Sequence, residues 1–136
     1  MSRRFISIMI AAGILAVGTA SAQQHRPYND IMKDVGATFA SLKKNLDSNS
    51  ATDAATDAAK LQELFTETEA FWAPLKTGDA VVFAKNAREA SAAAAAAAKG
   101  NDIKAAQASY SAIQKNCGNC LFAHREDTGK GFLIRP

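Results

Sequence analysis

Two cysteines, Cys117 and Cys120, are the residues whose types and spacing most clearly point to chemistry, and they are the only cysteines in the chain. Because they stand three residues apart, they cannot join distant segments as a disulfide framework does. On a helix they would share one side with Leu121 and His124. C-x-x-C followed by His is the attachment motif of c-type haem, in which the thiols bond the porphyrin and the imidazole ligates iron. Here Leu121 occupies the histidine position.

Other chemistry is compatible with the same thiols. Thioredoxin-like proteins also use C-x-x-C, but their first Cys lies at a helix N-terminus after a strand, whereas Cys117 is expected well inside a helix. A passive Cys117–Cys120 disulfide is a second interpretation for an oxidising compartment. With His124 the pair forms C-x-x-C-x-x-x-H, which offers three soft ligands to Zn²⁺ or Cu⁺, and His25 or Met32 could supply a fourth.

The elements that position these residues are expected to be helices. Apolar residues recur every three or four positions through four segments, and the chain contains thirty alanines but only three prolines. The expected helices span 27–48, 54–71, 79–99 and 102–124, and the third begins at the cap Asp79. Since each has one apolar side, an all-α, antiparallel, up-down-up-down four-helix bundle buries these sides most economically. The core of such a bundle is a natural ligand site.

The ends of the expected helices carry recognisable signals. Asp53 or Asp57 is expected to cap the second helix. Gly100 follows a seven-alanine tract, so it is predicted to be the left-handed residue that ends the third helix. Asn101 or Asp102 is expected to cap the fourth helix.

Residues 1–22 match a secretory signal peptide. Two arginines precede an apolar run over 5–17, and small residues lead up to Ala22. The run is short for a membrane span, although an uncleaved anchor is the competing interpretation. Cleavage after Ala22 would leave residues 23–136 as the bundle domain and, by removing both arginines, would lower the formal net charge from +3 to +1. We expect an exported protein, which in a Gram-negative cell means a periplasmic one.

Composition also excludes several classes of function. A nearly neutral domain without a Lys/Arg cluster has no electrostatic footprint for nucleic acid. After signal cleavage, no long apolar stretch or strongly basic amphipathic face remains for a membrane. The sequence shows no Ser/His/Asp constellation and no phosphate-binding loop, so we expect a protein that is not an enzyme.

The chain resembles the class II c-type cytochromes, the family of cytochrome c′ and its low-spin relatives of the cytochrome c556 type. The resemblance rests on an exported four-helix bundle with the C-x-x-C pair in its last helix. It rests also on Arg125, at the spacing where the family often has a basic residue, and on the first-helix segment 30–39. It covers nearly all of 23–136.

The resemblance implies covalent haem c on Cys117 and Cys120, with Arg125 beside a haem propionate. Met32 matches the position from which low-spin members supply the distal iron ligand. A thioether ligand raises the reduction potential, which suits electron transfer with a redox partner protein, whereas an open distal side suits binding of a small gas. Members of the family are often homodimers.

Leu121 departs from the family pattern, because its side chain offers iron no lone pair and the family's maturation machinery generally requires the histidine. Three interpretations stay open. Haem is attached through the cysteines, with His124 as a substitute proximal ligand one helical turn further on, or with no protein residue there. Alternatively, the bundle is a haem-free binding or interaction protein in which Leu121 packs as core. In the third, Leu121 records a single-base change of a His codon.

Overall fold

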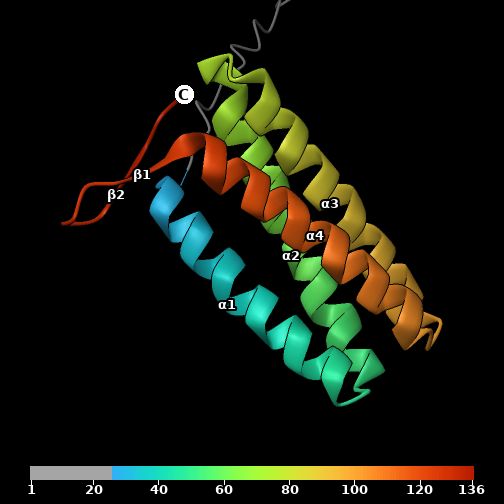
Figure 1. Ribbon diagram of the computed structural model, residues 1–136. Helices are drawn as coiled ribbons and strands as arrows, with labels where there is room; N and C mark the ends of the chain where they lie inside the picture. Colours follow the sequence, from blue (N-terminus) through green and yellow to red (C-terminus); the bar gives the residue numbers. More distant parts are fainter. Residues whose placement is uncertain (1–25) are drawn as a thin grey trace, which may run out of the picture.

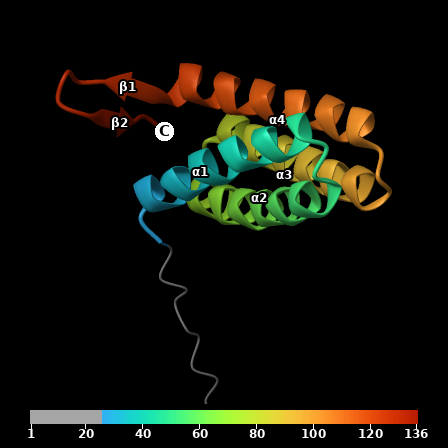
Figure 2. The ribbon, with the colours of Figure 1, turned by 90° about the horizontal axis from the view of Figure 1, so that it is seen from below.

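The computed structural model describes residues 26–136, whose four long helices pack as an antiparallel bundle (Figure 1, Figure 2). The helices are α1 (Tyr28–Asp47), α2 (Ala51–Trp72), α3 (Gly78–Lys99) and α4 (Ile103–His124), and a short 3₁₀ helix, η1 (Ala73–Leu75), follows α2. The predicted all-α four-helix bundle is confirmed. None of the helices in this described part is both long enough and apolar enough to cross a membrane. The segment interpreted as a signal peptide lies outside the described residues.

Left-handed asparagines close two of the connections between helices. Asn49 (φ 56°) follows α1, and Asn101 (φ 58°) follows α3. The Asn101 amide donates a hydrogen bond to the Ala98 carbonyl (2.9 Å), which satisfies one of the free carbonyls at the end of α3. The prediction for Gly100 is wrong, since its φ is −79°. The left-handed residue is the next one, because asparagine tolerates this conformation better than most other residues with a side chain.

The N-terminal caps agree with the prediction for one helix and disagree for another. Asp102 caps α4, because its carboxylate accepts a hydrogen bond from the amide three residues further on (2.9 Å). α2 begins at Ala51, and no side-chain hydrogen bond caps it, so the prediction that Asp53 or Asp57 is the cap is wrong. Asp53 instead lies in the first turn, where a carboxylate still interacts favourably with the helix dipole.

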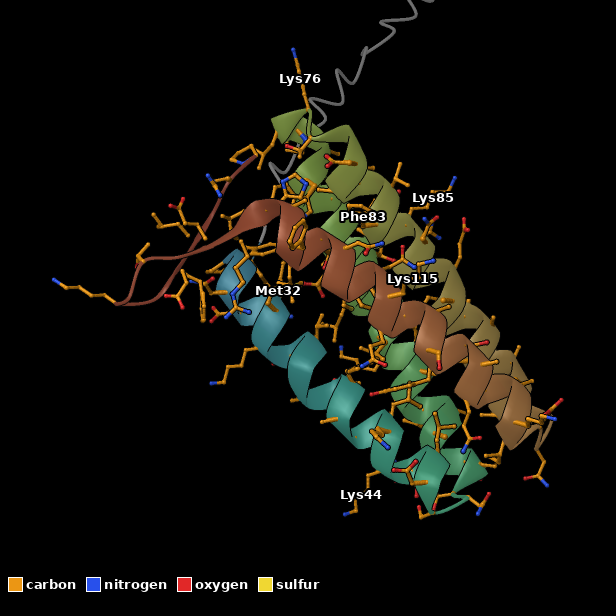
Figure 3. The ribbon with its side chains drawn as sticks, in the orientation of Figure 1. Met32, Lys44, Lys76, Phe83, Lys85 and Lys115 are labelled. Carbon is orange, nitrogen blue, oxygen red and sulfur yellow. The ribbon has the colours of Figure 1, made fainter. Side chains whose placement is uncertain are left out.

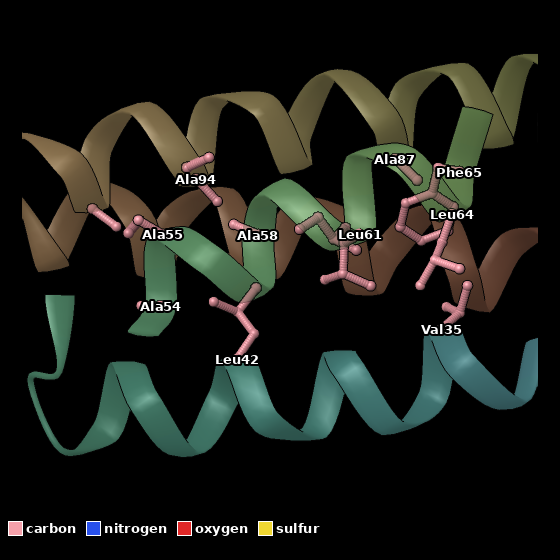
Figure 4. Packing of buried hydrophobic residues seen from close by; sticks show 14 of the residues in the cluster. Val35, Leu42, Ala54, Ala55, Ala58, Leu61, Leu64, Phe65, Ala87 and Ala94 are labelled. Carbon is pink, nitrogen blue, oxygen red and sulfur yellow. The ribbon is translucent and has the colours of Figure 1, made fainter. Parts of the chain in front are cut away.

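The core combines large aliphatic residues with many alanines, and both kinds lie on α2 (Figure 4). The largest buried aliphatic side chains include Leu42, Leu61, Leu64 and Ile113, all 0% exposed. The buried residues of α3 are all small: Ala80, Ala84, Ala87, Ser91, Ala94, Ala95 and Ala98. Because these side chains are short, α3 lies close against both α2 and α4. The alanine tract is therefore part of a well-packed helix whose small side chains allow α2 and α4 to approach it closely.

This close packing predicts a large difference between two adjacent alanines. Ala94 is 0% exposed, whereas Ala93 faces solvent. We expect Ala94→Leu to lower the free energy of unfolding by about 1–3 kcal/mol, because the added carbons must displace α2 or α4. The same change in Ala93→Leu should stay within about 0.5 kcal/mol. Urea denaturation followed by circular dichroism measures both, and equal effects would contradict close packing at Ala94.

The C-terminal segment forms a β-hairpin that the sequence analysis missed. Strands β1 (Arg125–Asp127) and β2 (Phe132–Ile134) pair antiparallel directly after α4. Gly129 (φ 73°) and Gly131 (φ 152°) adopt the positive φ values that the turn requires. The hairpin extends from the end of the bundle where α4 finishes and α1 begins (Figure 1, Figure 2).

Candidate functional site

An apolar cavity of about 430 Å³ lies between α1 and α4, and we name it the cysteine cavity. Of the helix pairs that neighbour each other around the bundle, α1 and α4 make the fewest contacts. The cavity is lined by Tyr28, Met32, Val35, Gly36, Phe39, Phe65, Thr68, Phe83, Ala84, Ala87, Gln114, Asn116, Cys117, Gly118, Cys120, Leu121 and Arg125. Its volume falls within the usual range for small-molecule and cofactor sites.

Both predicted attachment residues, Cys117 and Cys120, line this cavity from α4, and both are free thiols. Burial, together with the charge of the neighbouring Cys120, raises the pKa of Cys117 to about 11. Burial and the Asp79 carboxylate raise the pKa of Cys120 to about 11 as well. At neutral pH the pair is therefore protonated, which opposes a thioredoxin-like role that needs a ready thiolate.

The raised pKa values predict slow alkylation of the free thiols. A pKa of about 11 in place of 9.0 leaves about one hundredth of the thiolate at pH 8. We expect iodoacetamide to label haem-free folded protein about 100-fold more slowly than protein in urea, where the ordinary pKa returns. The rate should keep rising to near pH 11, because thiolate accumulates only as pH approaches the folded pKa. A rate that levels off near pH 9 would contradict the buried thiols.

Met32 faces the thiols from the opposite wall. It lies on α1 (Figure 3) and is half-buried. Because it lines the cavity, the structure brings the predicted distal residue to the same space as both cysteines. Phe83 of α3 also lines this space (Figure 3). Tyr28, one turn before Met32 on the same face of α1, was missed, although its spacing of four could have indicated it.

Leu121 lines the cavity next to Cys120 and is 40% exposed. Its side chain faces the cavity, but the isobutyl group carries no donor atom for a metal. The interpretation that Leu121 packs as core does not match this exposure, since core leucines such as Leu61 and Leu64 are 0% exposed.

His124 has a different environment from the cysteines. Its Nδ1 lies 2.8 Å from the Arg135 carbonyl, and its Nε2 lies 3.1 Å from the Asp79 carboxylate. The imidazole also packs on Trp72, with ring centroids 5.1 Å apart. It does not line the cysteine cavity. Both ring nitrogens are thus engaged, and ligation of iron by His124 would break one of these hydrogen bonds.

The prediction that Asp79 caps the third helix is wrong, because α3 begins at Gly78, its cap position is Thr77, and Asp79 lies in the first turn. Partial desolvation opposes its ionisation, but hydrogen bonds from the Ala80 amide and from His124 hold its pKa below the ordinary value. The carboxylate thereby links the start of α3 to the end of α4 through His124. Sequence spacing could not reveal this contact, because the two residues lie 45 positions apart.

Arg125 lies where the cysteine cavity meets a second cavity of about 360 Å³, which we name the hairpin cavity. The hairpin cavity is lined by Tyr28, Asn29, Met32, Lys33, Trp72, Cys120, Leu121, His124, Arg125, Phe132 and Ile134. The Arg125 guanidinium carbon stands 3.1 Å from the centre of the Phe132 ring, a cation–π contact that orients the side chain. The predicted propionate partner therefore lies at the rim of the cysteine cavity.

The metal alternative receives no support from the geometry. Within residues 26–136, no group of three or more His, Cys, Asp or Glu side chains is placed so that it could hold a metal ion. His124 is turned toward Asp79, and His25 lies outside the described residues. A soft-metal site would have to recruit Met32 across the cavity.

The fold and the cavity together define a class: a four-helix bundle with an apolar cavity that carries two thiols on one wall and a thioether on the other. Comparisons with protein-family models, curated proteins and solved structures find no match to this chain. The arrangement itself must therefore carry the functional argument. Chemically, it can enclose a flat apolar molecule, bond it through sulfur and place a cation beside an acidic substituent.

Proposed function

We propose that this protein is an exported, periplasmic haem protein of the class II c-type cytochrome kind, with haem held covalently by Cys117 and Cys120. One observation carries the proposal: both thiols and Met32 line a single apolar cavity between the two neighbouring helices that touch least. A bundle without a cofactor has no packing reason to leave two adjacent helices apart. The resemblance of the sequence to that family points to the same residues.

The residues of the cavity fit the organic part of a haem better than they fit its iron. Cys117 and Cys120 supply the sulfurs for two thioether bonds, and Phe83 and Met32 offer apolar surface for a flat ring. Arg125 provides a cation for a propionate. When bound, haem supplies an iron that can change oxidation state or bind a diatomic gas. On the α4 side, Leu121 provides no ligand and His124 is hydrogen-bonded elsewhere.

Between the two roles of such a protein, binding of a small gas is favoured. Leu121 removes the histidine that would ligate iron from α4, so Met32 is the one iron ligand of the family pattern that still lines the cavity. Efficient electron transfer profits from two fixed ligands that keep the iron geometry unchanged. Accordingly, a small gas is the first partner proposed, and a redox partner protein and a second copy of the chain are the next.

A second candidate function also rests on Leu121, which stands where the family has the haem-ligating histidine. If Leu121 prevents attachment of haem, the cysteine cavity remains as an apolar pocket in a haem-free binding or interaction protein. The raised pKa values of both thiols are consistent with cysteines that remain as unreactive wall residues. A Cys117–Cys120 disulfide in an oxidising compartment belongs to this candidate.

One experiment separates the two candidates. The full chain is expressed with its leader in a host that carries the cytochrome c maturation machinery, and the exported protein is examined by haem stain after denaturing electrophoresis and by intact mass. The proposal requires the mass of one haem, lost in the double variant Cys117→Ser/Cys120→Ser. Cleanly exported wild-type protein without added mass would overturn it and leave the haem-free candidate. A loss of two mass units at the cysteines would identify the disulfide.

A further inference from the structure

We propose that the hairpin cavity is a carboxylate-binding subsite, in which Trp72 Nε1 and the Arg125 guanidinium receive the carboxylate. The carboxylate has two sources, a propionate of a haem in the adjoining cysteine cavity or a free small carboxylic acid. The first source rests on the proposed function, whereas the second does not. The cavity lies between the start of α1, the end of α4 and the hairpin, which meet at one end of the bundle (Figure 2).

Trp72 supplies the first observation. It is 0% exposed, and its Nε1 is the one buried side-chain nitrogen or oxygen in residues 26–136 that has no hydrogen-bond partner. A buried donor without a partner costs roughly 1–3 kcal/mol, and a bound acceptor at this place would remove that cost. Tyr28 packs edge-on against the indole at 5.5 Å between centroids and lines the same cavity. Burial raises the pKa of the Tyr28 hydroxyl to about 12 and the neighbouring indole N–H opposes this shift, so the phenol and the indole N–H lie close together at this wall.

The charge of the lining is the second observation, and it is independent of the first. Arg125 and Lys33 line the cavity, and no Asp or Glu does. Neither cation forms an ion pair with any residue in 26–136, and the first 25 residues contain no acid that could pair with them. Two unpaired cations beside an unsatisfied N–H form an environment for an anion.

The apolar lining of the hairpin cavity favours an organic carboxylate over an inorganic anion. Leu121, Met32, Phe132 and Ile134 surround the polar groups with apolar surface. An inorganic anion would leave this surface in contact with water, whereas a carboxylate on a short hydrocarbon body covers it. Tyr28, Cys120 and Leu121 line both cavities, so the two cavities adjoin, and a substituent of a larger molecule in the cysteine cavity would lie next to the hairpin cavity.

The test uses butyrate as probe and Trp72 as reporter. Since Trp72 is the only tryptophan, its indole N–H gives a single ¹H–¹⁵N resonance. In haem-free exported protein, butyrate should move this proton downfield in a saturable way, while neutral butyramide at the same concentration should not. Arg125→Gln should weaken binding about ten-fold or more, as expected for a charged hydrogen-bond partner. Lys115→Gln, an exposed lysine of α4 outside the cavity, should not.

Equilibrium dialysis with labelled butyrate then distinguishes the two sources. Haem-loaded protein that no longer binds butyrate assigns the subsite to a haem propionate, whereas loaded protein that still binds it assigns the subsite to a free carboxylic acid. If no haem can be attached, the proposed function fails, but the haem-free titration still decides this proposal. An indole resonance that butyrate leaves unmoved, or that butyramide moves equally, overturns it. Trp72→Phe should weaken butyrate binding in dialysis, and unchanged binding would likewise overturn the role of Nε1.

Discussion

Replacement of Leu121 by histidine is expected to raise the amount of covalently attached haem per exported protein at least ten-fold. Leu121 lines the cysteine cavity next to Cys120, so an imidazole at this position would face the same space as the thiols. Loss of a residue that merely supports a metal ligand costs about 10–100-fold in metal affinity, and a direct ligand should be worth no less. The change also completes the C-x-x-C-H motif.

The matched control for this prediction is Phe122→His, one residue further along α4. Phe122 is 94% exposed and does not line the cavity, so its imidazole would face solvent. Both variants are measured by haem stain and by intact mass, beside the wild type. If Leu121→His binds no more haem than Phe122→His does, the cavity is not shaped for a porphyrin. If the wild type is already fully loaded, Leu121→His should instead change the visible spectrum by adding a nitrogen ligand.

The fold could be predicted from the sequence because the relevant signals are local. Helical spacing places Ile31, Val35, Leu42 and Leu46 on one face of α1, and all four are buried. Within the bundle, the errors fall at the ends of helices, where one residue decides between nearly equal alternatives. Asn101 could take the left-handed position instead of Gly100 because the energetic difference between them is small.

The candidate site was predictable in part. Helical spacing places Cys117 and Cys120 on one side of α4, and the resemblance to the family points to Met32. The structure places all three around one cavity. The environment of His124 does not follow, because its partners are Asp79 of α3 and Arg135, the residue that follows β2. Spacing along α4 indicates the side of the helix on which a residue lies. It does not indicate which groups from distant parts of the sequence form hydrogen bonds with the imidazole.

Trp72→Ala is expected to be among the most destabilising single substitutions in the domain, with a loss of about 3–5 kcal/mol in the free energy of unfolding. The indole is 0% exposed and contacts Tyr28, Phe71 and His124 through ring centroids 5.1 to 5.5 Å apart. It therefore joins the start of α1 to the ends of α2 and α4. Domains of this size are stable by only about 5–15 kcal/mol, so the variant should be partly unfolded near body temperature.

Two further variants separate the causes of that loss. Trp72→Phe keeps an aromatic ring and removes an N–H that has no partner, so it should cost clearly less than Trp72→Ala. Phe122→Ala removes an aromatic ring that is 94% exposed and should stay within about 0.5 kcal/mol. Urea denaturation without added carboxylate gives all three values. If Trp72→Phe costs as much as Trp72→Ala, the indole N–H has a partner in the folded protein, and the carboxylate subsite loses its unsatisfied donor.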